Sequence, residues 1–205
     1  MIASLKQQLP QVDAVIVGDY GKGVVTQRLL NELKPLCREH GVWLSLDPKP
    51  MHQLNLAGLS LITPNRKETF ALARVEDATR HADPFADKNL MLATEQLLRE
   101  LNPALLLITL GELGMLLCQR GQPPFHIPTV AQEVFDVSGA GDTVIATFTL
   151  AIAAGPPQSR RPSCLITPPA SSSARSARRP QAPQNCSRVS ATDSHRPTRV
   201  KCVSH

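Results

Sequence analysis

The stretch that decides the fold is Asp136-Val-Ser-Gly-Ala-Gly-Asp-Thr-Val-Ile-Ala146, in which small residues precede an apolar segment. Residues 143–154 carry no charge and are mostly apolar, which favours a buried helix. The uncharged apolar stretch from Thr143 to Gly155 has 13 residues, too few for a membrane span. Small residues before a helix let backbone N–H groups approach an anion at the positive end of the helix dipole. The stretch therefore predicts an anion site where the helix begins.

Asp142 lies at the same helix start, where a carboxylate beside a bound phosphate would be repelled. A chemical task, such as taking a proton from an attacking hydroxyl, would explain its presence. The alternative is that Asp142 is only an N-terminal helix residue that the dipole favours. The short string Gly-Ala-Gly-Asp leaves both interpretations open.

Short apolar runs alternate with helical patterns before this stretch, which predicts β-α-β units. The expected strands are Ala14–Gly18, Val42–Leu46, Leu59–Thr63, Ala104–Leu110, Gly114–Cys118 and Phe125–Pro128. The first expected helix is capped by Thr26 and ends at Gly41, although Pro35 inside it suggests a kink or an early end. The other expected helices are Lys67–Ala73, Lys88–Leu101 and Thr143–Ala154. We expect an α/β fold with a mainly parallel sheet and helices on both faces. The loops at 19–23, 47–50, 63–68, 109–114 and 136–142 should then line one edge of the sheet.

The composition divides the chain near residue 155. Residues 1–155 hold 16 acidic and 13 basic residues, whereas residues 156–205 hold 1 and 9. All 11 glycines lie in the first part, and 8 of the 18 prolines lie in the second. A segment with so little apolar surface cannot offset its ordering entropy. We expect residues 1–155 to be the folding unit and residues 156–205 to be a disordered basic tail.

Several classes of protein are disfavoured. Residues 1–10 contain no apolar run of signal-peptide length. The five cysteines are far apart and form no C-x-x-C pair, which indicates neither a disulfide framework nor a zinc site. A soluble protein of the reducing cytoplasm fits these features best.

Three motifs resemble one family. Residues 136–146 resemble the C-terminal signature of ribokinase-like (phosphofructokinase B type) sugar kinases. Thr109-Leu-Gly-Glu-Leu-Gly114 and Asn65-Arg-Lys-Glu68 resemble, in the family order, its T-x-G-x-x-G nucleotide loop and its N-x-x-E motif. Within the family, residues 17–23 and Asp47-Pro-Lys49 most resemble the kinase domains of bifunctional ADP-heptose synthesis proteins. The resemblance runs from about residue 10 to residue 155.

The resemblance implies ATP-dependent phosphorylation of the anomeric hydroxyl of D-glycero-β-D-manno-heptose 7-phosphate, a step of lipopolysaccharide core synthesis. Asp142 would be the general base, and the N–H groups of Gly139, Ala140 and Gly141 would form the anion hole. The residues implied at the ATP are Asn65, Arg66, Lys67, Glu68, Thr109, Gly111 and Gly114. Mg²⁺ would bind mainly through phosphates and water, with Glu68 acting through water.

Three further residues are expected at the sugar phosphate. Lys22 and Lys49 would supply cations for an anionic substrate, and Asp19 would contact a sugar hydroxyl. The alternatives are solvated loop lysines and a turn aspartate. The implied partners are a sugar phosphate and ATP, without nucleic acid or membrane, and full-length family members would be homodimers. Another sugar or nucleoside kinase, or a nucleotide-binding module without catalysis, remains an alternative.

Family members have about as much chain again before Asp13, including a glycine-rich sugar-binding signature and a β lid. They also continue through another helix after residue 155. We therefore interpret the chain as a fragment that has little or no kinase activity alone. A peptide typical of the family can be written in GC-rich codons. When these codons are read one nucleotide later, they encode Ile166–Pro180 of this chain. This match suggests a frameshift between about residues 155 and 164. The competing hypothesis is a basic arm that binds nucleic acid or acidic membrane, although it lacks aromatic residues for stacking.

Overall fold

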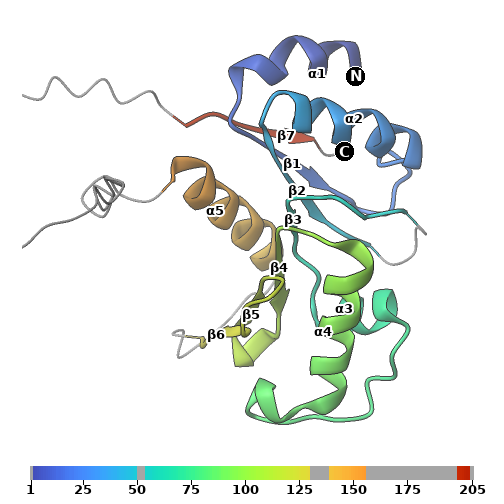
Figure 1. Cartoon of the computed structure of the whole chain (residues 1–205), viewed down its shortest axis with the longest axis vertical. Coiled ribbons are helices and arrows are strands. Elements are labelled where there is room, and N and C mark those ends of the chain that lie inside the picture. Colours follow the sequence, from blue (N-terminus) through green and yellow to red (C-terminus); the bar gives the residue numbers. More distant parts are fainter. Residues whose placement is uncertain (1, 50–53, 130–138, 156–197, 204–205) are drawn as a thin grey trace, which may run out of the picture. The chain divides into compact units, whose positions relative to one another are not determined.

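The computed structural model of the chain describes residues 2–49, 54–129, 139–155 and 198–203. These residues form one seven-stranded sheet with the order β6-β5-β4-β3-β2-β1-β7 (Figure 1). The strands are β1 (Ala14–Gly18), β2 (Trp43–Asp47), β3 (Leu61–Ile62), β4 (Leu105–Thr109), β5 (Met115–Cys118), β6 (Phe125–Ile127) and β7 (Val200–Val203). All neighbours from β7 to β4 pair in parallel, whereas β5 and β6 pair antiparallel. The expected mainly parallel sheet is confirmed.

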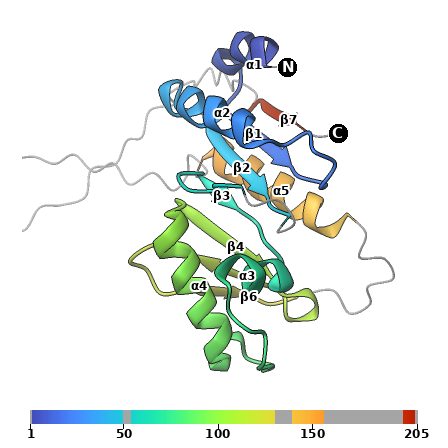
Figure 2. The same ribbon diagram turned by 90° about the vertical axis from the view of Figure 1, so that its right-hand side faces the viewer.

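Helices cover both faces of this sheet (Figure 2). The α-helices are α1 (Ile2–Gln8), α2 (Gln27–Glu39), α3 (Arg66–Ala73), α4 (Lys88–Leu101) and α5 (Ala140–Ala154). Short 3-10 turns lie at Leu9–Gln11, Pro84–Ala86 and Gly111–Leu113. The larger hydrophobic core joins the sheet to α1–α4, and a smaller core joins the opposite face to α5.

The two-residue period of the strands sorts side chains between these cores. In β1, Val15 and Val17 belong to the larger core, whereas Ile16 belongs to the core under α5. In β2 the same alternation places Ser45 on the α5 side, where its hydroxyl lies 2.7 Å from that of Thr149. Ile16 and Ser45 thus point to the face of the sheet that α5 covers. A polar residue an even number of positions further along the same strand points to that face too.

The two ends of α2 test the predicted cap at Thr26 and the predicted effect of Pro35. Thr26 caps α2 as expected, because its Oγ1 accepts from the N–H of Leu29 at 3.2 Å. The helix α2 continues to Glu39 with His40 as its C-cap, close to the expected end at Gly41, so of the two alternatives at Pro35 the early end is wrong. Proline costs the helix a hydrogen bond, but the buried residues Leu33 and Cys37 on both sides of it keep the helix on the sheet.

The helix α5 begins at Ala140, three residues before the expected start at Thr143. Gly139 precedes it with a φ of +79°, a left-handed conformation that glycine adopts readily. The Oγ1 of Thr143 donates to the carbonyl of Gly139 at 3.0 Å. Asp142 therefore lies within the first turn of the helix.

The sheet also contains a strand from the segment expected to be a tail. The strand β7 pairs in parallel with β1, and Val203 at its end is 6% exposed. The carbonyl of Arg199 accepts from the N–H of Asp13 at 2.8 Å, and the N–H of Arg199 donates to the Asp13 carboxylate at 2.9 Å. Residues 156–197 lie outside the described residues, so the boundary at 155 and the frameshift stay predictions.

Candidate functional site

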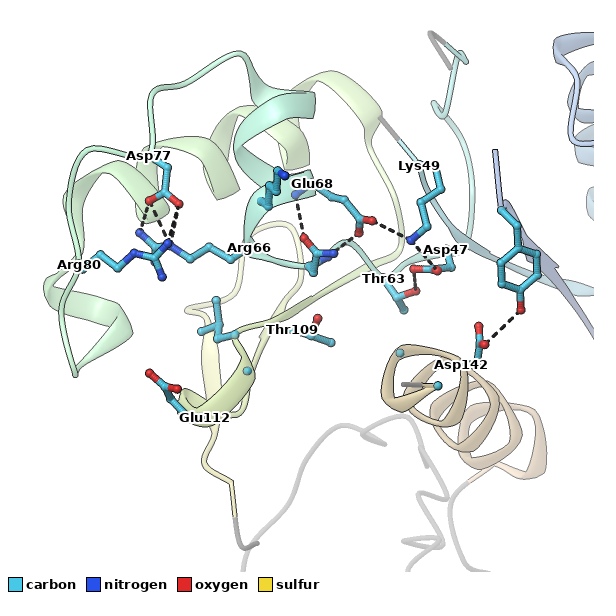
Figure 3. Close-up of a pocket in the computed structure, with 17 residues that line it drawn as sticks. Asp47, Lys49, Thr63, Arg66, Glu68, Asp77, Arg80, Thr109, Glu112 and Asp142 are labelled. Carbon is cyan, nitrogen blue, oxygen red and sulfur yellow. Dashed lines mark hydrogen bonds and ion pairs between the residues drawn. The ribbon is translucent and has the colours of Figure 1, made fainter. Parts of the chain in front are cut away.

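A cavity of about 800 Å³ lies where the predicted loops meet (Figure 3). Its walls come from the ends of β2, β3 and β4, from the starts of α3 and α5, and from the loop after β1. Ten of the fourteen residues expected at a site line it: Lys49, Asn65, Arg66, Lys67, Glu68, Thr109, Gly111, Gly139, Gly141 and Asp142. The structure thus brings most of the expected residues together.

The first turn of α5 forms one wall, with Gly139, Gly141 and Asp142. The first N–H groups of an α-helix have no acceptor inside the helix, so they are available to a ligand. The exposed Asp142 carboxylate accepts a hydrogen bond from the hydroxyl of Tyr20, with 3.1 Å between Oη and Oδ2. This wall therefore offers backbone donors for an anion beside a carboxylate.

The motif Asn65-Arg-Lys-Glu68 forms a capping box at the start of α3. Asn65 Oδ1 accepts from the N–H of Glu68 at 2.9 Å, and Glu68 Oε2 accepts from the N–H of Asn65 at the same distance. The other oxygen of Glu68, Oε1, accepts from Lys49 Nζ at 2.8 Å. The motif thus fixes a carboxylate that is only 6% exposed at the cavity wall.

The end of β4 lies beside this capping box. Thr109 forms a β-bridge with Asn65, and its N–H donates to the carbonyl of Pro64 at 3.0 Å. Two motifs that lie far apart in the sequence are therefore neighbours. Thr109, Gly111 and the acidic residue Glu112 complete this part of the wall.

A partly buried carboxyl group, that of Asp47, sits between these two walls. Desolvation raises the pKa of Asp47 to about 6, and the nearby Glu68 and Asp142 raise it while Lys49 lowers it. Lys49 Nζ lies 3.5 Å from Asp47 Oδ2. Although burial alone would lower the pKa of Lys49, its contacts with Glu68 and Asp47 outweigh burial and raise that pKa. Two carboxyl groups, those of Asp47 and Glu68, thus flank one lysine that lines the cavity.

Arg66 lines the cavity, but its guanidinium holds the surrounding loop together. Its Nη2 lies 2.6 Å from Asp77 Oδ1 and 2.8 Å from Asp87 Oδ2, and its guanidinium carbon lies 4.9 Å from the ring centre of Phe70. The adjacent Lys67 is exposed and makes no ion pair with any described residue. Of these two cations, Lys67 is the one whose charge is available to a ligand.

Three expected residues do not line the cavity, namely Gly114, Asp19 and Lys22. Gly114 has a φ of +86°, and a Cβ there would lie 2.1 Å from the carbonyl oxygen of Ile127, so chain packing requires this glycine. Asp19 is 1% exposed and its Oδ1 accepts from the N–H of Gly21 at 2.9 Å, which matches the alternative of a turn residue. Lys22 is exposed away from the cavity. Ala140 lies in the first turn of α5 between two lining residues.

Several lining residues have no role that the sequence predicts. Asp47 and Thr63 end or follow strands β2 and β3, and the strand period could have placed them at this edge. Tyr20 lies in a loop that carries part of the family resemblance, but its contact with Asp142 depends on tertiary structure. No local pattern indicates Arg80, Asp77 or Glu112.

The described residues contain neither a three-residue metal-binding cluster nor a membrane-spanning helix. Within residues 2–49, 54–129, 139–155 and 198–203, no group of three His, Cys, Asp or Glu side chains is arranged to hold a metal ion. In the same part of the chain, no helix combines the length and the apolar character needed to cross a membrane.

Comparisons with known proteins give one consistent result. A profile described as pfkB family carbohydrate kinase matches residues 2–162. The bifunctional protein HldE of Desulfatibacillum aliphaticivorans is 43% identical over 150 residues, which cover 73% of this chain and 29% of that protein. The HldE of Mesorhizobium japonicum is 41% identical over 155 residues, covering 76% and 30%. The chain thus spans about 30% of the length of the curated relatives it matches.

Solved structures show the same fold. The structure of Arabidopsis thaliana ribokinase complexed with ribose and ATP has a TM-score of 0.63 and 20% identity, and the match covers 76% of this chain and 48% of that one. The structure of Escherichia coli phosphofructokinase-2 in complex with substrates and products has a TM-score of 0.59 and 18% identity, covering 77% and 50%. The matched part of the chain therefore has a ribokinase-like fold.

Proposed function

Because the chain belongs to the pfkB family of carbohydrate kinases, we propose that its cavity is the phosphoryl-transfer site of an ATP-dependent sugar kinase. One observation carries this proposal. The first turn of α5, with Asp142, lines the same cavity as Thr109 and the capping box of Asn65 and Glu68. A phosphate-binding helix start, a carboxylate and a polar nucleotide wall are the parts that phosphoryl transfer to an alcohol needs.

In this proposal Asp142 takes the proton from the sugar hydroxyl as that oxygen attacks the γ-phosphorus of ATP. Backbone N–H groups of Gly139, Ala140 and Gly141 stabilise the negative charge on the transferring phosphoryl group. ADP is the leaving group, and the proton goes to the Asp142 carboxylate. The expected gain from such a base is about 10²–10⁴-fold in rate.

The nucleotide is proposed to lie along Thr109, Gly111 and the start of α3. Mg²⁺ would be held mainly by the phosphates and water, with Glu68 orienting one of these waters. The residues present fit this arrangement, because both Glu68 oxygens already accept hydrogen bonds and the cavity carries an excess of carboxyl groups. A cation at the phosphates would offset that charge.

The proposed acceptor is D-glycero-β-D-manno-heptose 7-phosphate, in the cytoplasm. The resemblance of residues 17–23 and 47–49 to heptose kinase domains supports this choice. Lys49, Lys67 and Arg80 give the cavity cations for an anionic substrate, and the side chain of Arg80 is 78% exposed. Lys22 is left out of the proposed site because it does not line the cavity.

A transfer assay tests both levels of this proposal. Because the chain alone is expected to have little or no kinase activity, it is assayed joined to the N-terminal part of an HldE kinase domain. The joined protein receives MgATP with a labelled γ-phosphate and, in separate reactions, heptose 7-phosphate, fructose 6-phosphate or ribose. We expect label on the anomeric oxygen of heptose 7-phosphate, and a loss of at least about 100-fold in Asp142→Asn. The control is Asp83→Asn, an exposed aspartate outside the cavity whose replacement amide can still accept from the N–H of Phe85.

The outcomes separate the alternatives. Equal transfer to all acceptors would refute the heptose assignment and keep the sugar kinase. ATP binding without any transfer would support a nucleotide-binding module without catalysis. Transfer at the wild-type rate by Asp142→Asn would refute the proposed base.

A further inference from the structure

Tyr20 joins two elements that meet at the cavity. It follows β1 by two residues, and its ring is held against Gly18, where a Cβ would lie 3.4 Å from Tyr20 Cε2. The side chain lines the cavity and the residue is 49% exposed. The ring is thus held at the end of β1 while its hydroxyl donates a hydrogen bond to Asp142 in the first turn of α5.

The hydroxyl of Tyr20 holds one oxygen of the Asp142 carboxylate. Tyr20 Oη donates to Asp142 Oδ2 across 3.1 Å, although 122 positions separate the residues in the sequence. Asp142 is exposed in the first turn of α5, where a side chain can adopt several rotamers. Among the described residues, Tyr20 supplies the side-chain hydrogen bond to this carboxylate. Oδ1 takes no part in that bond and can receive a proton.

Tyr20 acts as a donor and not as a second base. Burial raises the pKa of its hydroxyl above the ordinary value of 10, and the hydrogen bond to Asp142 and the charge of that carboxylate raise it further. Cys202 and Asp47 act in the same direction. The hydroxyl is therefore protonated at neutral pH, when Asp142 has to be ionised to accept a proton.

We propose that Tyr20 is a positioning residue that fixes the Asp142 carboxylate for proton transfer from the sugar hydroxyl. The inference rests on the proposed role of Asp142 as general base. Reacting groups must lie within a narrow range of distance and angle, and a displacement of about 1 Å can cost about 100-fold in rate. The loss of one hydrogen bond that orients the carboxylate should therefore lower turnover and spare nucleotide binding.

A titration without turnover tests the contact first. Tyr20 is the one tyrosine in the chain, so the alkaline absorbance change of tyrosinate reports on it alone. In Asp142→Ala we expect the transition to move to lower pH, because the bond and the charge that raise the Tyr20 pKa are gone. The control is Asp83→Ala, which should leave the transition in place. An unchanged transition in Asp142→Ala overturns the inference.

A kinetic comparison tests the positioning role. Tyr20→Phe keeps the ring against Gly18 and removes only the hydroxyl. We expect kcat for sugar phosphorylation to fall about 10-fold, with the KM for MgATP and the thermal midpoint unchanged. In the Asp142→Asn background the same change should cause no further loss.

The two proposals fail in different ways. Wild-type kcat in Tyr20→Phe, together with an inactive Asp142→Asn, overturns the positioning role and leaves the proposed function intact. Full activity in Asp142→Asn overturns the proposed function itself. A fall in the thermal midpoint of Tyr20→Phe that accounts for the lost activity would make the role structural and also overturn the inference.

Discussion

At the scale of single residues, the cavity places the carboxyl groups of Asp47 and Glu68 beside the ammonium group of Lys49. Burial keeps Asp47 neutral more readily than a surface aspartate. Glu68 instead has both oxygens bonded, one to Lys49 and one to a backbone N–H. The two carboxyl groups should therefore respond differently to pH and to a divalent cation.

Asp47 should make stability depend on pH in a defined direction. Its pKa rises from the ordinary 3.8 to about 6 on folding. As pH rises, Asp47 in the unfolded chain therefore loses its proton at a lower pH than Asp47 in the folded chain. Its contribution to the free energy of unfolding is full below about pH 4 and is lost as pH rises to about 6, on the order of 3 kcal/mol. In urea denaturation, the free energy of unfolding of the wild type minus that of Asp47→Asn should fall as pH rises over this window. A difference that stays constant over this window would contradict it.

Replacing Glu68 should change the Mg²⁺ requirement more than the stability of α3. Glutamine can replace glutamate in a capping box, so Glu68→Gln should keep α3 stable while it removes one charge beside the phosphates. We expect the Mg²⁺ concentration for half-maximal ATP turnover to rise about 10-fold. The check is a magnesium titration at fixed ATP, with Glu76→Gln on the exposed surface as control. An unchanged magnesium requirement would remove Glu68 from the metal's surroundings.

At the scale of elements, local signals predict most helices and strands well. The helix α4 has the expected bounds because Asp87 Oδ1 accepts from the N–H of Leu90 at 3.1 Å and Asn102 ends the helix in a left-handed conformation. The motif residues of the site were also predictable, since capping boxes and helix starts are local. The Tyr20–Asp142 contact was not, because it depends on the packing of α5 against β1.

The strand β7 illustrates a second limit of sequence patterns. Four residues, Val200–Val203, form a strand because the edge of β1 offers backbone groups, not because their local pattern requires it. Removing residues 198–205 should expose that edge. We expect faster hydrogen exchange at the β1 amides that face β7 and unchanged exchange in β3 and β4. Equal protection of β1 with and without these residues would show that β7 does not contribute to the sheet.

At the scale of the whole molecule, the matched segment arranges loops from widely separated strands around one cavity. The sequence predicted this edge because parallel strands present their carboxyl ends together. It did not predict which cations would be available, since Arg66 is paired with Asp77 and Asp87 through a loop without a recognisable pattern. Nucleotide binding should therefore depend on backbone donors more than on that arginine.

The binding site of the ATP phosphates is the central claim, and amide hydrogen exchange with and without MgATP tests it most directly. The account predicts that MgATP slows exchange at residues 139–143 and 109–111, while the edge strand β6 and the helix α2 keep their rates. Protection confined to other segments, or no protection at residues 139–143 at a saturating MgATP concentration, would contradict it.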